Sequence, residues 1–270
     1  MADKSSIVFI SSRFPYPTEK GDKLRAYQQI KQLKQLGHSI YLVSLSDSEI
    51  TTEHLAEMEK YCSEIKTFKI GKFQIFFNLL FGIFKLWPFQ VSYFYSAAIR
   101  KKIKTIVYKI NPDVVFFQLI RTAPYSKGLR CDFKVLDYQD AFSINMQQRA
   151  GFGLTGIFYA IESLLLRRFE SRCYSWFDKH LIISEKDRDE LVLKEKEVQV
   201  LRNAVDTEFY TPMASHHDYD IVFVGNMNYE PNVKATVYLV EQIMPLVWKQ
   251  FPAAKVVIAG ANPHRKVLSL

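Results

Sequence analysis

Short hydrophobic runs alternate with longer segments of helical periodicity along most of the chain. The first run, residues 7–11 (IVFIS), is rich in β-formers and predicts a strand. In the segment 22–37, small or apolar residues recur at steps of four, three and four from Ala26 to Gly37, which predicts a helix. Asp22 stands where the helix N-cap is expected, and Gly37 where the helix ends.

The same alternation continues over the following residues. Further strands are predicted at 39–45, 65–70, 113–118, 133–138, 179–184 and 198–201, and helices at 52–62, 92–110 and 142–177. Ser184 and Asp187 form a capping box at the start of another helix. Strands that alternate with helices favour an α/β fold with a parallel, doubly wound sheet.

The pattern breaks at residues 203–219, which are polar and contain Pro212, and then restarts. A strand is predicted at 220–227, a helix at 233–251 and a strand at 254–261. We therefore expect an N-terminal domain at 1–202, a linker at 203–219 and a second domain at 220–270. The last segment is far shorter than the ~100–150 residues of a typical domain. We expect it to be only the first part of one.

Composition and charge narrow the functional classes only partly. Hydrophobic residues make up 48% of the 270 residues, which is enough for a core. The net charge of +8 suits an anionic ligand, nucleic acid or an anionic membrane surface, and does not choose among them. The basic residues are spread widely and no binding motif occurs, so nucleic acid is the partner we expect least.

The three cysteines, Cys62, Cys131 and Cys173, are far apart and lack metal-ligand spacing. We therefore expect no metal site, no cofactor and no disulfide framework, and a cytoplasmic location. The first residues do not have the shape of a signal peptide, and no run reaches the ~20 apolar residues of a membrane span.

The loop at 13–25 (RFPYPTEKGDKLR) connects the carboxyl end of a predicted strand to the start of a helix. In open α/β sheets ligands bind at such places, and a helix N-terminus beside a glycine favours phosphate. Gly21 would allow close approach of a ligand, with Asp22, Lys23 and Arg25 beside it. The alternative is an ordinary turn with a helix cap.

Seven segments, in this order and spacing, carry a resemblance to a known family. They are RFPYPTEKGDKLRAY (13–27), PFQVSYFYSAAIRKKI (88–103), LDYQDAFS (136–143), LIISEKDRDEL (181–191), LRNAVDTEFYTP (201–212), VGNMNYEPNVKA (224–235) and IAGANPHRKVLSL (258–270). Together they resemble the family 4 glycosyltransferases of the GT-B fold, and in particular a bacterial subgroup associated with exopolysaccharide gene clusters.

The resemblance implies a retaining sugar transferase with two Rossmann-like halves. The N-terminal half would hold a sugar or lipid-linked acceptor and the C-terminal half a nucleotide-sugar donor, without a metal. Helix N-termini and basic side chains would stabilise the diphosphate leaving group. The binding residues implied are Gly21, Asp22, Lys23, Arg25, Arg202, Asn203, Gly225 and Asn226.

The sequence departs from the family pattern in three places. Asn226 and Pro231 stand where the family usually has the Arg and Lys that clamp the diphosphate, and Arg202 could supply the charge instead or be a solvated surface residue. Ala204 replaces the glycine of the linker signature. The Glu-x7-Glu motif, whose glutamates contact the donor, would follow Leu270.

Among the carboxylates, Asp140 is the catalytic candidate, because the resemblance places residues 137–140 near the cleft. It would orient an acceptor hydroxyl or act as a base. The alternative is a cap on the following helix. Glu162 and Glu170 lie on one helix face amid arginines, and we expect them to be ion-paired surface residues.

The stretch 72–95 is unusually aromatic and is flanked by lysines and arginines. This pattern suits peripheral contact with an anionic membrane, or equally helices packed in the N-terminal core. The leading functional prediction is a sugar transferase, and the rival is a truncated, catalytically impaired relative that acts as a binding module.

Overall fold

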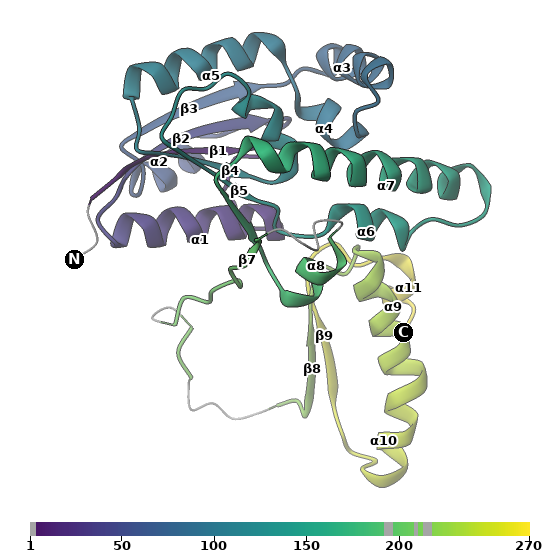
Figure 1. The fold of residues 1–270 in the computed structure, drawn as a ribbon. Helices are drawn as coiled ribbons and strands as arrows, with labels where there is room; N and C mark the ends of the chain where they lie inside the picture. Colours follow the sequence, from purple (N-terminus) through teal and green to yellow (C-terminus); the bar gives the residue numbers. More distant parts are fainter. Residues whose placement is uncertain (1–3, 192–196, 208–209, 213–217) are drawn as a thin grey trace. The chain divides into compact units, whose positions relative to one another are not determined.

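The computed structural model describes residues 4–191, 197–207, 210–212 and 218–270. The chain divides into two compact units, Met1–Val205 and Asp206–Leu270 (Figure 1). The boundary falls inside the predicted linker at 203–219, part of which lies outside the described residues. Each unit is built on its own parallel sheet.

The first unit contains a seven-stranded sheet in the order β3-β2-β1-β4-β5-β6-β7, and every neighbouring pair is parallel. Its strands are β1 (Ser6–Ser11), β2 (Ser39–Ser46), β3 (Glu64–Lys69), β4 (Val114–Gln118), β5 (Phe133–Asp137), β6 (Lys179–Ile182) and β7 (Gln199–Val200). The predicted parallel α/β architecture is confirmed. The order reverses direction between β1 and β4, which is the switch point where ligands bind in such sheets.

Helices cover both faces of this sheet (Figure 1). They are α1 (Gly21–Gln35), α2 (Thr52–Glu59), α3 (Lys72–Lys85), α4 (Phe89–Phe94), α5 (Ala97–Ile110), α6 (Phe142–Gln147), α7 (Gly153–Cys173) and α8 (Glu185–Glu190). Alternate residues of β1 point to opposite faces. Phe9 packs with Ile30 of α1, whereas Ile10 belongs to the core that contains Ile103 of α5 and Leu166 of α7.

Three local predictions are wrong. The helix α1 begins at Gly21, and its N-cap is Lys20 without a side-chain hydrogen bond, because the Asp22 carboxylate is paired with Arg13 instead. The predicted helix at 142–177 is split into α6 and α7, and α7 begins at Gly153, which has a φ of 85° that favours glycine. The predicted helix at 92–110 is likewise two helices, because Ser96 caps α5 anew.

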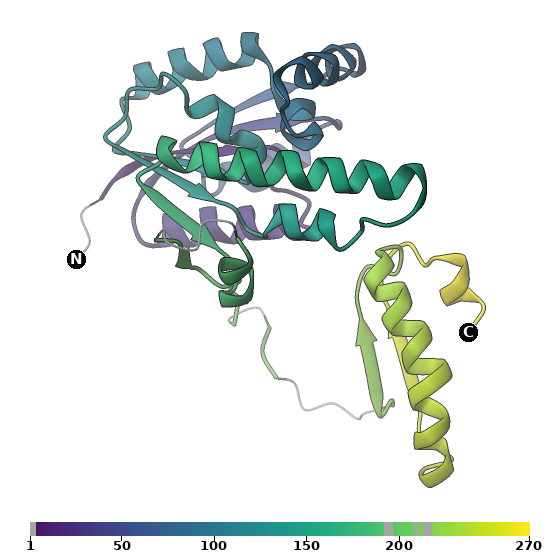
Figure 2. The ribbon, with the colours of Figure 1, turned by 45° about the vertical axis from the view of Figure 1, so that its right-hand side comes forward.

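The second unit pairs β8 (Ile221–Val224) in parallel with β9 (Val256–Ala259). The segment between them consists of α9 (Glu230–Tyr238), a π-helical turn (Leu239–Ile243) and α10 (Met244–Gln250). The short helix α11 (Arg265–Leu268) follows β9. Figure 2 shows α9 and α10 running along one side of the two strands. Pro245 lies just after this π-helical turn and has no N–H to donate to the carbonyl oxygen of Glu241, so the regular α-helical hydrogen bonds are interrupted here.

Two glycines bring the strand ends of the second unit together. A Cβ on Gly260 would lie 1.7 Å from the carbonyl oxygen of Gly225, so the two backbones touch. Gly225 N–H donates to Ala259 O at 3.0 Å, which extends the ladder to this point. Among the described residues no helix is long and apolar enough to cross a membrane.

Candidate functional site

The carboxyl ends of β1, β4 and β5 meet at one edge of the seven-stranded sheet. Gln118 at the end of β4 is in register with Asp137 at the end of β5. The segments that leave these strands carry Arg13, Arg121 and Asp140. Because all three strands are parallel, polar residues from distant parts of the sequence come together at this edge.

A buried ion pair lies at the centre of this edge. Arg25 Nε donates to Asp137 Oδ2 at 2.7 Å and Arg25 Nη2 donates to Asp137 Oδ1 at 3.1 Å. The side chains are 2% and 0% exposed. Such a bidentate pair is shorter and stronger than a neutral hydrogen bond, and it fixes α1 against β5.

Further groups complete the surroundings of this ion pair. Gln29 Nε2 donates to Asp137 Oδ2 at 2.6 Å, and the backbone N–H of Gln139 donates to Oδ1 at 3.0 Å. Arg25 Nη1 donates to Asn203 Oδ1 at 2.8 Å, which connects α1 to the segment after β7. Two predicted site residues, Arg25 and Asn203, are therefore direct partners, and the charge of Arg25 is balanced by Asp137.

Asp140 lies three residues after Asp137, the last residue of β5, on the turn between β5 and α6. Burial, followed by the nearby Asp187 carboxylate, raises the pKa of Asp140 to about 6. Arg25 acts in the opposite direction. Gln139, just before Asp140, has a φ of 64°, which lies in the left-handed region and is typical of a residue in a turn. A carboxylate with a raised pKa is a better proton acceptor than an ordinary one and is still ionised at neutral pH.

The loop after β1 is tied to the same edge through Asp22. Arg13 Nη1 donates to Asp22 Oδ2 at 2.7 Å, and Arg121 Nη1 lies 3.8 Å from the same oxygen. Burial, followed by the neighbouring Arg13, lowers the pKa of Arg121 to about 10. The carboxylates of Asp22, Asp47 and, least, Asp140 oppose this change in the pKa. Arg13, Arg121, Asp22 and Asp140 therefore form one electrostatically connected group.

Gly21 and Lys23 lie at the start of α1. A Cβ on Gly21 would meet no heavy atom within 4 Å, so nothing in the chain fills the space beside it. Lys23 Nζ donates to Glu19 Oε1 at 3.0 Å, and its side chain is 10% exposed. The predicted basic character of this loop is thus partly neutralised by Glu19 and Asp137.

Two other predicted binding residues, Arg202 and Asn226, are engaged with neighbours in their own segments of the structure. Arg202 is 75% exposed and donates to Glu185 Oε1 at 2.8 Å. In the second unit, Asn226 Oδ1 accepts from the backbone N–H of Asn228 at 3.0 Å, and Asn226 O accepts from Asn232 Nδ2 at 3.0 Å. The Asn226 side chain therefore shapes the turn that leads from β8 to α9.

The prediction that Glu162 and Glu170 are ion-paired surface residues is wrong. Each is 1% exposed. Glu162 accepts from the backbone N–H groups of Phe89 and Gln90 at 2.7 and 3.0 Å, so it caps the start of α4. Glu170 accepts from Ser143 N–H and Oγ at 3.2 and 2.7 Å, and burial raises its pKa to about 7.

Sequence reasoning missed Arg121, Gln29 and the partner of Arg25. Arg121 follows the strand β4 by three residues, so its position after a predicted strand was a usable signal. Gln29 gave no such signal, because its role depends on Asp137, which lies 108 positions away in the chain.

A scan of the chain against known protein families finds no match. A relative described as an uncharacterized 44.6 kDa protein in the cps region of Klebsiella pneumoniae is 24% identical over 263 residues. The alignment covers 95% of this chain and 65% of the relative, so the chain spans about 65% of the length of that protein.

Solved structures reveal the fold. The chain is similar to sucrose-phosphate synthase from Thermosynechococcus elongatus, with a TM-score of 0.59 and 12% identity over 98% of this chain and 72% of that one. It is also similar to an α-glucosyltransferase in complex with UDP and a 13-mer DNA, with a TM-score of 0.54 and 12% identity over 99% and 60%. The fold is the GT-B glycosyltransferase fold.

The GT-B fold that the sequence resemblance implied is thus confirmed, and membership of family 4 stays a prediction. The low ranking of nucleic acid as a partner also stays a prediction, since three similar structures of α-glucosyltransferase contain DNA.

Proposed function

We propose that the chain belongs to a glycosyltransferase that moves a sugar from a nucleotide-sugar donor to a polysaccharide or lipid-linked acceptor, with retention of configuration. The observation that carries the proposal is the half-buried Asp140 carboxylate, whose pKa is raised to about 6, at the carboxyl end of β5 in a sheet of the GT-B fold. The relative from the cps region supports a role in polysaccharide assembly.

In this proposal the first unit holds the acceptor. Asp140 accepts a hydrogen bond from the acceptor hydroxyl and takes up its proton as the oxygen bonds to the anomeric carbon. The acceptor oxygen arrives on the face of the sugar from which the diphosphate oxygen departs, so the bond from the anomeric carbon to that oxygen breaks with retention and the nucleoside diphosphate leaves. The raised pKa of Asp140 suits this role, because the carboxylate is ionised at neutral pH yet more basic than an exposed one.

Positive groups would stabilise the leaving diphosphate. The N-terminus of α1 at Gly21 presents backbone N–H groups, and the open space beside Gly21 would admit a phosphate. Lys23, Arg202, Gly225 and Asn226 remain proposed donor contacts. Arg25 and Asn203 would act by positioning α1, since Arg25 is occupied by Asp137.

We also propose peripheral contact with the inner face of the cell membrane through α3. Phe73, Phe77 and Phe84 on this helix are 86%, 65% and 87% exposed, which supports the contact. The later part of the aromatic stretch packs in the core, as the alternative expects, through Val91 and Phe94 of α4. Lysines at both ends of α3 suit anionic lipid. Co-sedimentation with anionic vesicles at low salt is expected, and wild-type-like sedimentation of a Phe73→Ser/Phe77→Ser variant would contradict the contact.

A second candidate function is a binding module that lacks a donor site. It is favoured by Asn226, whose side chain is engaged with Asn228 within its own turn. Titration calorimetry of the 270-residue chain with UDP, GDP and UDP-glucose distinguishes the two functions. The transferase proposal expects micromolar binding of a nucleotide, and no heat with any nucleotide from a folded chain would favour the binding module.

A further inference from the structure

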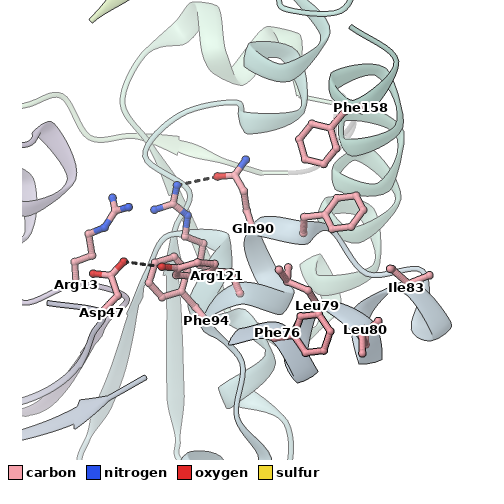
Figure 3. Close-up of a pocket in the computed structure, with 12 residues that line it drawn as sticks. Arg13, Asp47, Phe76, Leu79, Leu80, Ile83, Gln90, Phe94, Arg121 and Phe158 are labelled. Atoms are coloured by element: carbon pink, nitrogen blue, oxygen red, sulfur yellow. Dashed lines mark hydrogen bonds between the residues drawn. The ribbon is translucent and has the colours of Figure 1, made fainter. Parts of the chain in front are cut away.

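A cavity of about 760 Å³ opens in the first unit beside α3 and α4 (Figure 3). This volume lies within the usual range of sites for small molecules. The two ends of the cavity differ in chemistry. Figure 3 shows Arg13, Asp47 and the Arg121 guanidinium gathered at one end, and Phe76, Leu80 and other apolar side chains toward the other.

The apolar wall comes from three helices. Phe76, Leu80 and Ile83 recur along one stripe of α3, and their side chains remain 59%, 40% and 53% exposed. Phe89 of α4 and Phe158 of α7 complete the wall, with ring centroids 5.1 Å apart. An apolar chain that covered these side chains would be bound by the removal of apolar surface from water.

The polar end offers both hydrogen-bond donors and acceptors. The Asp47 carboxylate accepts from Tyr93 Oη at 3.2 Å, and Arg121 Nη2 donates to Gln90 Oε1 at 2.8 Å. Arg13 is paired with Asp22 at 2.7 Å. The positive charges of Arg13 and Arg121 are thus balanced by the negative charges of Asp22 and Asp47.

The Arg121 guanidinium is buried but not fully hydrogen-bonded. Its Nε and Nη1 atoms have no hydrogen-bond partner within the part of the chain that the structure describes. The group lies over the rings of Phe94 and Phe142, at 5.3 and 5.1 Å from their centroids. Unsatisfied buried donors are rare in folded proteins and need an explanation, and a polar ligand group at this end of the cavity supplies one.

The polar end of the cavity is linked to the proposed catalytic group through Arg121. Arg121 lines the cavity, and the Asp140 carboxylate acts on its charge, although Asp140 is not one of the residues that line the cavity. Asp22, which pairs with Arg13, lies on α1 at the same edge of the sheet. A ligand head group held here would therefore contact Arg121, the side chain that connects the cavity to the residue that we propose to act on an acceptor hydroxyl.

We infer that this cavity binds the acceptor, and that the acceptor is an amphiphile with a neutral, hydroxyl-rich head of the sugar type and a hydrocarbon chain along α3 and α4. The inference rests on the proposed function. Hydroxyls both donate and accept, which matches the mixture of arginine, glutamine and aspartate at the polar end. A strongly anionic head fits less well, since Asp47 lies on the wall of the cavity.

Titration calorimetry with octyl β-glucoside below its critical micelle concentration tests the inference on the 270-residue chain. Free glucose tests the head alone, and octyl phosphate replaces the neutral head by an anionic one. We expect a Kd below about 1 mM for octyl β-glucoside and at least tenfold weaker binding of both other probes. Equal or tighter binding of octyl phosphate would overturn the assignment of a neutral head.

Two variants separate the cavity from surface adsorption. Phe76→Asp places a charge in the apolar wall, whereas Tyr108→Asp on α5 changes a residue that is 82% exposed and is not part of the wall. We expect at least about tenfold weaker octyl β-glucoside binding for Phe76→Asp and a change below twofold for Tyr108→Asp. Equal losses in the two variants, or no binding by the folded wild-type chain, would overturn the inference.

Asp47→Ala tests the polar end, because it removes an acceptor without touching the apolar wall. We expect weaker binding of octyl β-glucoside and unchanged or tighter binding of octyl phosphate. Titration of the same preparations with UDP keeps the two proposals apart. UDP binding without octyl β-glucoside binding refutes the acceptor cavity alone, and the opposite result refutes the donor site alone.

Discussion

Arg25 and Asp137 form a bidentate ion pair that is almost fully removed from solvent, although 112 positions separate them in the chain. The pair joins the first helix to the carboxyl end of strand β5, at the edge of the sheet where the proposed site lies. Because each charge is satisfied only by the other and by neighbouring amides, loss of one partner leaves an uncompensated buried charge.

The variant Arg25→Met is therefore expected to lower the free energy of unfolding by about 3–5 kcal/mol, measured by urea denaturation. Arg202→Met is the matched control, since Arg202 is 75% exposed and its pair with Glu185 contributes at most about 1 kcal/mol. Equal, small losses in both variants would contradict a structural role for the Arg25–Asp137 pair.

Glu170 predicts a pH dependence of stability. Burial raises its pKa from 4.5 to about 7, so the folded state binds a proton more tightly than the unfolded state. The contribution of Glu170 to stability is therefore complete below about pH 4.5 and is lost as the pH rises toward 7. We expect Glu170→Gln to gain stability relative to wild type between pH 5 and pH 8, by an amount on the order of 2–3 kcal/mol.

Urea denaturation at the two pH values measures this gain. The control is Glu59→Gln, which changes an exposed carboxylate and is expected to follow the wild-type curve. A Glu170→Gln difference that is constant with pH would show that this carboxylate does not have a raised pKa.

The variant Gly21→Ala is expected to weaken nucleotide binding without lowering the stability of the fold. The Gly21→Ala methyl group would meet no atom within 4 Å, so the free energy of unfolding should change by less than about 0.5 kcal/mol. If a phosphate occupies this space, UDP affinity should fall by at least about tenfold, measured by calorimetry. Gly71→Ala at the start of α3 is sterically equivalent and should leave UDP affinity unchanged.

Gly260 is expected to be essential for the second unit. In Gly260→Ala the new methyl group would lie 1.7 Å from the Gly225 carbonyl oxygen, which is backbone and cannot move without disturbing β8. Hydrogen exchange should show loss of amide protection throughout β8 and β9. Gly225→Ala should be milder, because the nearest atom is the end of the Asn232 side chain, and wild-type protection in Gly260→Ala would contradict the close packing.

Local periodicity predicted most of the elements, and long-range contacts account for the errors. The strand at 7–11 and the helix end at Gly37 follow from residue pattern alone and are confirmed. Asp22 was mistaken for a cap because its partner, Arg13, could be identified only in three dimensions. Glu162 and Glu170 were placed at the surface, because no helical pattern shows which face a neighbouring helix will cover.

The candidate site was predictable in outline for a similar reason. The loop at 13–25 follows a predicted strand of a parallel sheet, where ligands bind, so it could be assigned from the residue pattern. Asp140 was assigned to the same region by the family resemblance. The pairing of Arg25 with Asp137, the role of Gln29 and the cavity beside α3 depend on side-chain packing between distant segments.

The most direct test of the account is sugar transfer by the wild-type chain and by Asp140→Asn, followed as nucleotide release that depends on an added acceptor. We predict that the wild-type rate rises as the pH increases through about 6, where Asp140 ionises, and that Asp140→Asn is slower by at least about a hundredfold. An Asp140→Asn rate equal to that of wild type, or a wild-type rate that does not change as the pH rises through about 6, would contradict the account.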